Sequence, residues 1–138
     1  MKKIIKNLEA LNVFAKNLAA SLQGGQVVAL SGNLGAGKTT LTQLVAKHLG
    51  VKDNLQSPTF SILKIYPVIA QNFSKFCHID LYRLDGKKNH LGLEEYLGDS
   101  DVVCFVEWAE KIKPQLPPNT IWLKLEAQAD GSRLVIIS

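Results

Sequence analysis

The sequence predicts a three-layer α/β domain in which helices cover a mixed sheet of parallel and antiparallel strands. Helical spacing of apolar residues dominates the first third of the chain, and runs with strand character dominate the rest. The run 102–106, Val-Val-Cys-Phe-Val, is apolar throughout, which is typical of a central strand buried on both faces. The last two predicted strands are joined at Asp130-Gly131, so antiparallel strands are expected at the edge of the sheet.

The elements are expected in a regular order along the chain. Residues 4–22 are amphipathic, and apolar side chains three and four positions apart from Leu8 onward predict a helix that Gly24 and Gly25 end. The further elements are a strand at 26–31, a helix at 38–49, strands at 59–66 and 76–82, a short helix around 93–97, and strands at 102–106, 120–126 and 133–137.

Length and composition indicate one soluble domain spanning 1–138. The hydrophobic fraction is 46% and the charged fraction 20%, close to the average for globular proteins. Apolar runs stay well short of the roughly 18 to 20 residues that cross a membrane. The N-terminal residues lack the apolar stretch of a secretory signal, so we expect a cytoplasmic protein.

The cysteines and the net charge exclude some classes of function. Cys77 and Cys104 lie inside apolar or strand-like runs, which favours buried thiols over a disulfide or a metal site. The net charge of +4 comes almost entirely from dispersed lysines, which indicates solubility more than a nucleic-acid platform. The chain contains only two arginines, Arg83 and Arg133.

The stretch 32–39, GNLGAGKT, matches the phosphate-binding pattern G-x-x-x-x-G-K-[ST] at every fixed position. A predicted strand precedes it and a predicted helix follows, as this motif requires. The backbone of Gly35, Ala36 and Gly37 can wrap a phosphate and turn its N–H groups inward. The helix that begins at the end of the loop points its positive dipole end at the same anion.

The side chains that follow the loop give each phosphate a partner. Lys38 can reach the outer phosphates, the Thr39 hydroxyl can ligate Mg²⁺, and Thr40 can hydrogen-bond an inner phosphate. The sequence therefore predicts a site for a nucleoside triphosphate.

Such a loop needs a carboxylate at the end of a neighbouring buried strand to hold Mg²⁺. Glu107 follows the run 102–106 and is the candidate, although aspartate is more usual. Asp80 is a further candidate, because alternation places His78, Asp80 and Tyr82 on one strand face. That face suits either a functional edge or a solvated surface.

Between the loop helix and the next strand lies the segment 57–60, Ser-Pro-Thr-Phe. Thr59 there suits either a sensor of the γ-phosphate or a turn that enters a strand.

Together these segments resemble the TsaE family, formerly YjeE, over about residues 8–133. The resemblance rests on GNLGAGKTT at 32–40, SPTF at 57–60, HIDLYRL at 78–84, LEEY at 93–96 and VEW at 106–108. It implies a cytoplasmic ATPase that uses ATP and Mg²⁺ and joins the TsaB and TsaD proteins. Its ATP turnover would support threonylcarbamoyladenosine formation at position 37 of tRNA, with tRNA contacted at most indirectly.

The resemblance also assigns roles to residues. The loop and Lys38 bind phosphates, Thr39 and Glu107 handle Mg²⁺, and Asp80 is the leading catalytic or water-orienting carboxylate. With Asp80, the residues Lys38 and Glu107 form the expected catalytic set.

Trp108 is expected beside the nucleotide or the partner surface, and Arg133 in the final hairpin near the nucleotide. Two small departures from the family pattern are Asn33, where aspartate is usual, and Ala109, where proline often follows the Glu-Trp pair.

Three other functions compete with this interpretation. A GTPase would carry N-K-x-D and D-x-x-G elements, and neither string occurs in the sequence. A small-molecule kinase would gather several arginines around the transferred phosphoryl group, and two are too few for that. A nucleotide-dependent binding module with slow hydrolysis overlaps with the family role, and Thr59 and Asp80 could report the γ-phosphate in either case.

Overall fold

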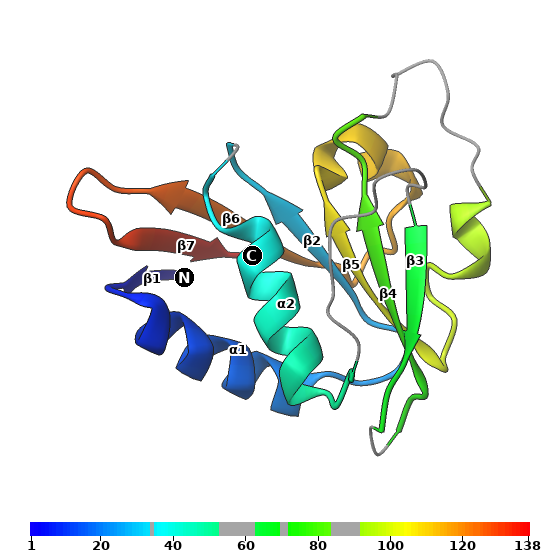
Figure 1. Ribbon diagram of the computed structural model, residues 1–138. Coiled ribbons are helices and arrows are strands. Elements are labelled where there is room, and N and C mark those ends of the chain that lie inside the picture. The colour runs from blue at the N-terminus through cyan, green and yellow to red at the C-terminus, as the bar shows by residue number, and fades with distance from the viewer. Residues whose placement is uncertain (34, 53–62, 70–71, 84–91) are drawn as a thin grey trace.

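The computed structural model describes residues 1–33, 35–52, 63–69, 72–83 and 92–138. Its strands form one seven-stranded sheet in the order β1-β7-β6-β2-β5-β4-β3 (Figure 1). The elements are β1 (Lys2–Ile5), α1 (Leu8–Ser21), β2 (Val27–Ser31), α2 (Lys38–His48), β3 (Leu63–Pro67), β4 (Lys75–Asp80), the 3₁₀ helix η1 (Leu93–Glu95), β5 (Val102–Glu107), the 3₁₀ helix η2 (Ala109–Gln115), β6 (Ile121–Ala127) and β7 (Arg133–Ile137).

The sheet is mixed with antiparallel strands at its edge, as predicted, and the structure has such strands at both edges. Strands β6, β2, β5 and β4 run parallel to their neighbours, whereas β3 pairs with β4, and β7 with β6 and β1, in the antiparallel sense. Every residue of β5 is buried, as the apolar run 102–106 predicts. The carboxyl ends of the parallel strands all lie at the same end of the sheet, and the site described below lies at that end.

Two cores, one on each face of the sheet, account for the three layers. Helices α1 and α2 lie side by side over one face (Figure 1), where Leu41 and Val45 of α2 join Phe105 of β5 in one apolar cluster. On the other face Ala109 and Ile112 of η2 pack with residues of β2, β4 and β5 in a second cluster. The α/β fold with a mixed sheet is therefore confirmed.

The first residues of the chain correct the sequence prediction. Lys2–Ile5 forms the edge strand β1, paired with β7, instead of extending the amphipathic helix. The side chain of Asn7 accepts a 2.8 Å hydrogen bond from the backbone N–H of Ala10 and so caps the helix, which begins at Leu8. The edge of β7 is available only in three dimensions, so the helical periodicity did not reveal the strand.

The other element boundaries differ in smaller ways. Strand β4 ends at Asp80, two residues early, because the Asp80 carboxylate accepts a hydrogen bond from the N–H of Tyr82 and turns the chain. Tyr82 is thus not part of the strand face predicted for it. Of the strand expected at 59–66, β3 begins at Leu63, and the earlier part lies outside the described residues. The helix expected around 93–97 is the short η1.

Cys77 and Cys104 are buried free thiols, as the sequence predicts. They face each other in the register of β4 and β5, and the neighbouring Cys77 thiol together with burial raises the pKa of Cys104. Within the described part of the chain, no helix combines the length and the apolar character needed to cross a lipid bilayer.

Candidate nucleotide-binding site

The glycine-rich loop joins the end of β2 to the start of α2, as the motif requires. Gly32, Gly35 and Gly37 have φ angles of 133°, 80° and 102°, in the left-handed region that side chains disfavour. Gly37 is the N-cap of α2 and offers no side chain to its first N–H groups, and the first turn holds no acidic residue. These N–H groups and the helix dipole therefore suit an external anion. Leu34 lies outside the described residues.

Lys38 folds back over the loop. Its Nζ donates hydrogen bonds to the carbonyl oxygens of Gly32 and of Asn33, the latter at 3.0 Å, and lies 4.2 Å from the ring centroid of Trp108. The residue is only 4% exposed. Burial lowers the pKa of Lys38, and the nearby carboxylates, Glu107 first, oppose that shift. A cation thus stands where the loop would bring phosphates.

Glu107 contacts the loop helix directly. The Thr39 hydroxyl donates a 2.8 Å hydrogen bond to Oε1 of Glu107, and Nε2 of His78 lies 2.6 Å from Oε2 of the same carboxylate. Glu107 is 2% exposed and His78 is fully buried. A hydroxyl and a carboxylate are oxygen donors that Mg²⁺ prefers, and nucleotide phosphates and water usually complete its coordination. These two residues therefore fit the metal expected beside the loop.

Within the described ranges, no group of three or more acidic, histidine or cysteine side chains is arranged to hold a metal by itself.

Asp80 lies next to Glu107 at the same edge of the sheet, because the two residues are register partners on the parallel strands β4 and β5. Its side chain is partly exposed, and its Oδ1 accepts a 3.0 Å hydrogen bond from the N–H of Tyr82. His78 precedes it on the same face and is fully buried, so that face of β4 is covered at His78 and opens to solvent only toward Asp80. Asp80 is also one of the carboxylates that oppose the lowering of the Lys38 pKa, after Glu107 and Glu110.

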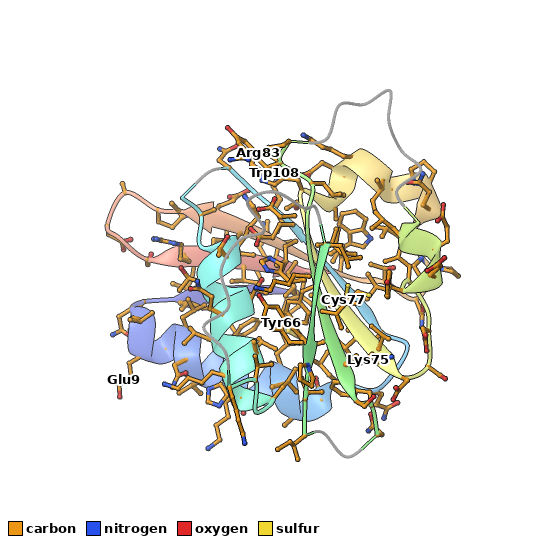
Figure 2. All side chains as sticks on the ribbon, turned by 45° about the vertical axis from the view of Figure 1, so that its right-hand side comes forward. Glu9, Tyr66, Lys75, Cys77, Arg83 and Trp108 are labelled. Carbon is orange, nitrogen blue, oxygen red and sulfur yellow. The ribbon has the colours of Figure 1, made fainter. Side chains whose placement is uncertain are left out.

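Aromatic and basic side chains flank the loop. Trp108 has the left-handed φ of 59°, which is rare for a bulky residue and turns its ring toward Lys38 and toward Tyr82, whose ring centroid is 5.3 Å away. Figure 2 labels Trp108 and Arg83 in the same upper part of the molecule, and Lys75 and Cys77 of β4 below them.

Arg133, at the start of β7, lies close to the loop from the hairpin side. Its Nε is 3.5 Å from the position that a Cβ would take on Gly37. Its guanidinium also donates to the carbonyl oxygen of Gly131 at 3.2 Å.

The structure brings most of the predicted residues together around the carboxyl ends of β2, β4 and β5. They are Gly35, Ala36, Gly37, Lys38, Thr39, Asp80, Glu107, Trp108 and Arg133. Thr40 is exposed in the first turn of α2, and Thr59 lies outside the described residues. The contact that sequence reasoning missed is the one from His78 to Glu107. The alternation of side chains along the strand predicted which face His78 lies on, but it could not predict that His78 contacts Glu107.

A glycine loop between a central parallel strand and a helix, with an acidic residue ending the neighbouring strand, places the chain in the P-loop class of α/β folds. Comparison with known proteins identifies the family. The family model for threonylcarbamoyl adenosine biosynthesis protein TsaE matches residues 5–135.

Curated relatives and a solved structure agree with this match. The tRNA threonylcarbamoyladenosine biosynthesis protein TsaE of Bacillus subtilis is 39% identical over 127 residues, covering 92% of this chain and 78% of the relative. The protein of the same name from Rickettsia felis is 39% identical over 137 residues, covering 97% and 77%. The crystal structure of Bacillus subtilis YdiB superposes with a TM-score of 0.74 at 34% identity, covering 98% of this chain and 82% of that one. The chain belongs to the TsaE family of threonylcarbamoyladenosine biosynthesis proteins.

Proposed function

We propose that this chain binds and hydrolyses ATP in support of threonylcarbamoyladenosine formation at position 37 of tRNA, acting with TsaB and TsaD. The observation that carries the proposal is the 2.8 Å hydrogen bond between Thr39 and Glu107 at the foot of the glycine loop. It joins the hydroxyl and the carboxylate that a P-loop uses for Mg²⁺. Family membership supplies the biosynthetic role.

The residues of the chain divide the work of binding. The N–H groups of the loop and of the first turn of α2 hold the phosphates, with Thr40 on an inner one. Lys38 exchanges its contacts with the loop carbonyls for the outer phosphates, whose charge is a stronger partner for an ammonium group. Thr39 and Glu107 would hold Mg²⁺, which neutralises charge on the transferring phosphoryl group. Trp108 and Arg133 flank the nucleotide.

Asp80 is proposed to orient the attacking water. Hydrolysis forms a bond from the oxygen of water to the γ-phosphorus and breaks the bond from that phosphorus to the bridging oxygen of ADP, while the proton of the water passes to solvent or to the released phosphate. A partly exposed carboxylate next to Glu107 can accept a hydrogen bond from that water. Oδ1 of Asp80 accepts from the N–H of Tyr82, so the other oxygen of the carboxylate is the one proposed for this contact.

The proposed partners follow from the family, and the proposed mode of action follows from the charge. The lysines are dispersed and the sequence has only two arginines, too few for a dedicated nucleic-acid platform, so the chain is proposed to act on tRNA indirectly, through TsaB and TsaD, in the cytoplasm. Turnover is expected to be slow in the isolated chain and faster in the complex.

The test is ATP hydrolysis by the purified chain, alone and with TsaB and TsaD from the same source. Stimulation by the partners that is lost in Lys38→Ala would support the proposal, since that variant lacks the phosphate-binding cation. Basal hydrolysis without any response to TsaB and TsaD would leave a P-loop ATPase and reject the partnership. Transfer of phosphate to a small molecule in place of its release would favour a kinase.

A further inference from the structure

The buried contact between His78 and Glu107 connects the proposed metal site to the centre of the sheet. His78 is fully buried on β4, and its Nε2 lies 2.6 Å from Oε2 of Glu107. Among the described residues, Nδ1 of His78 has no hydrogen-bond partner although it is also buried. Within the described part of the chain, the polar contact of the ring is thus the one with the carboxylate proposed to hold Mg²⁺.

The contact assigns the proton when Glu107 is ionised, as a ligand to Mg²⁺ would be. An unprotonated ring nitrogen and a carboxylate would repel each other at 2.6 Å, so Nε2 then carries a proton and donates it to Glu107. Among the described residues Nδ1 has no hydrogen-bond partner, so no contact there draws the proton of the ring to that nitrogen.

Both oxygens of the Glu107 carboxylate are thus engaged from different elements. Oε2 accepts from His78 on β4, and Oε1 accepts from the Thr39 hydroxyl on α2 at 2.8 Å. Two hydrogen bonds to opposite oxygens prevent rotation of the carboxylate about its last bond.

We propose that His78 is a positioning residue for the Mg²⁺ site: its Nε2–H holds the Glu107 carboxylate in the orientation that engages Thr39. This inference rests on the proposed function, because it concerns the metal that accompanies the nucleotide. Partners of metal ligands commonly act in this way, by fixing the orientation and charge of a ligand that they contact. The alternative is a core histidine that only fills space, and it predicts no selective effect on the metal.

Three substitutions separate these possibilities. His78→Gln places an amide nitrogen near the position of Nε2 and keeps the donor. His78→Asn carries the same amide but is one methylene too short to reach Glu107. His78→Leu removes the donor and keeps an apolar side chain. His48→Gln on exposed α2 surface, where Nε2 lies 2.9 Å from Oδ1 of Asn12, is the control for replacing a histidine elsewhere.

The readout is the affinity for a non-hydrolysable ATP analogue, measured by calorimetry with Mg²⁺ and again with EDTA, together with the melting temperature. The ratio of the affinity with Mg²⁺ to the affinity with EDTA, called the Mg²⁺ enhancement, separates the contribution of the metal from that of the phosphate contacts. Loss of a partner of a metal ligand typically costs about 10- to 100-fold. We expect His78→Asn and His78→Leu to lose about 10-fold or more of the Mg²⁺ enhancement, while the metal-free affinity stays within about twofold.

His78→Gln should keep the enhancement within about threefold of the unmodified protein. The inference is overturned if His78→Asn retains full enhancement, if His78→Gln is no better than His78→Asn, or if metal-free affinity falls in the same proportion. If His78→Leu fails to fold, the comparison of His78→Gln with His78→Asn still tests whether the donor at this position supports the Mg²⁺ enhancement. Absence of any Mg²⁺ enhancement in the unmodified protein would instead reject the proposed nucleotide function, and that outcome is read before any variant is compared.

Discussion

The hydroxyl of Thr39 donates a 2.8 Å hydrogen bond to Glu107, a residue 68 positions further along the chain. The contact is possible because β2 and β5 are adjacent parallel strands, with Leu30 opposite Glu107, and because α2 begins directly after the loop that follows β2. The glycine loop and the end of β5, which are far apart in the sequence, thus meet where the carboxyl ends of the central strands lie.

Glu107→Gln should impair the use of Mg²⁺ more than the binding of nucleotide. The amide keeps the shape of the side chain but removes the charge that attracts the cation, so hydrolysis should fall by at least about 10-fold at low Mg²⁺. Metal-free affinity should be unchanged or higher, since a negative charge near the phosphates is gone. Hydrolysis measured across Mg²⁺ concentrations checks this, with exposed Glu9→Gln as the control. An unchanged Mg²⁺ profile would place the metal elsewhere.

Asp80→Asn should lower turnover while leaving nucleotide affinity nearly intact. The amide can still accept the hydrogen bond from the N–H of Tyr82, so the local turn is preserved. It is a poorer acceptor for the hydrogen bond from the attacking water, and a loss of about 10²-fold or more is expected if Asp80 orients that water. Single-turnover hydrolysis at saturating ATP is the measurement. Equal rates for the two proteins would remove Asp80 from the catalytic set.

Trp108 should report occupation of the site through its fluorescence. The ammonium group of Lys38 lies 4.2 Å from the ring centroid, and movement of that charge toward phosphates changes the field at the indole. Titration with ATP and Mg²⁺ should therefore alter the emission in the unmodified protein and in Trp122→Phe, and should not do so in Trp108→Phe. A signal that persists in Trp108→Phe would show that the change arises elsewhere.

Gly32→Ala should destabilise the fold more than Gly35→Ala. Both positions have positive φ, which costs an alanine about 1–2 kcal/mol. At Gly32 an added Cβ would also lie 2.3 Å from the carbonyl oxygen of Leu125 on β6, whereas at Gly35 it would meet nothing within 4 Å. The clash should add about 1–3 kcal/mol. Urea unfolding of the two variants gives the comparison, and equal losses would mean that the loop yields freely at Gly32.

The turn of the β6–β7 hairpin should contribute stability that depends on pH through Asp130. The side-chain hydroxyl and then the N–H of Ser132 donate to the Asp130 carboxylate and lower its pKa below the ordinary value of 3.8. Because the folded pKa is the lower one, this stabilisation is complete above pH 3.8 and is lost as the pH falls through the folded pKa.

Melting curves should show Asp130→Ala less stable than the unmodified protein at neutral pH, with the difference shrinking in acid. Asp130→Asn keeps an acceptor for Ser132 but does not titrate, so the difference in melting temperature between Asp130→Asn and Asp130→Ala should not shrink in acid. A gap between the unmodified protein and Asp130→Ala that stays constant down to low pH would contradict the assignment.

The local features of this protein were predictable from the sequence alone. The glycine loop at 32–39 is contiguous, so its phosphate-binding chemistry can be predicted without knowing any distant contact. The buried strand β5 was predictable because residues 102–106 form an unbroken apolar run. The acidic residue that ends β5 could be named for the same reason, since the strand itself marks its position.

Tertiary structure alone decided which residues these features meet. Strand β1 exists because β7 offers it an edge, and an edge is a property of the assembled sheet. His78 reaches Glu107 because β4 and β5 are neighbours, and periodicity along one strand carries no information about which strand lies beside it. The loop and the buried strand could therefore be predicted from the sequence. The order of the strands, in contrast, determines that His78 and Thr39 both contact Glu107.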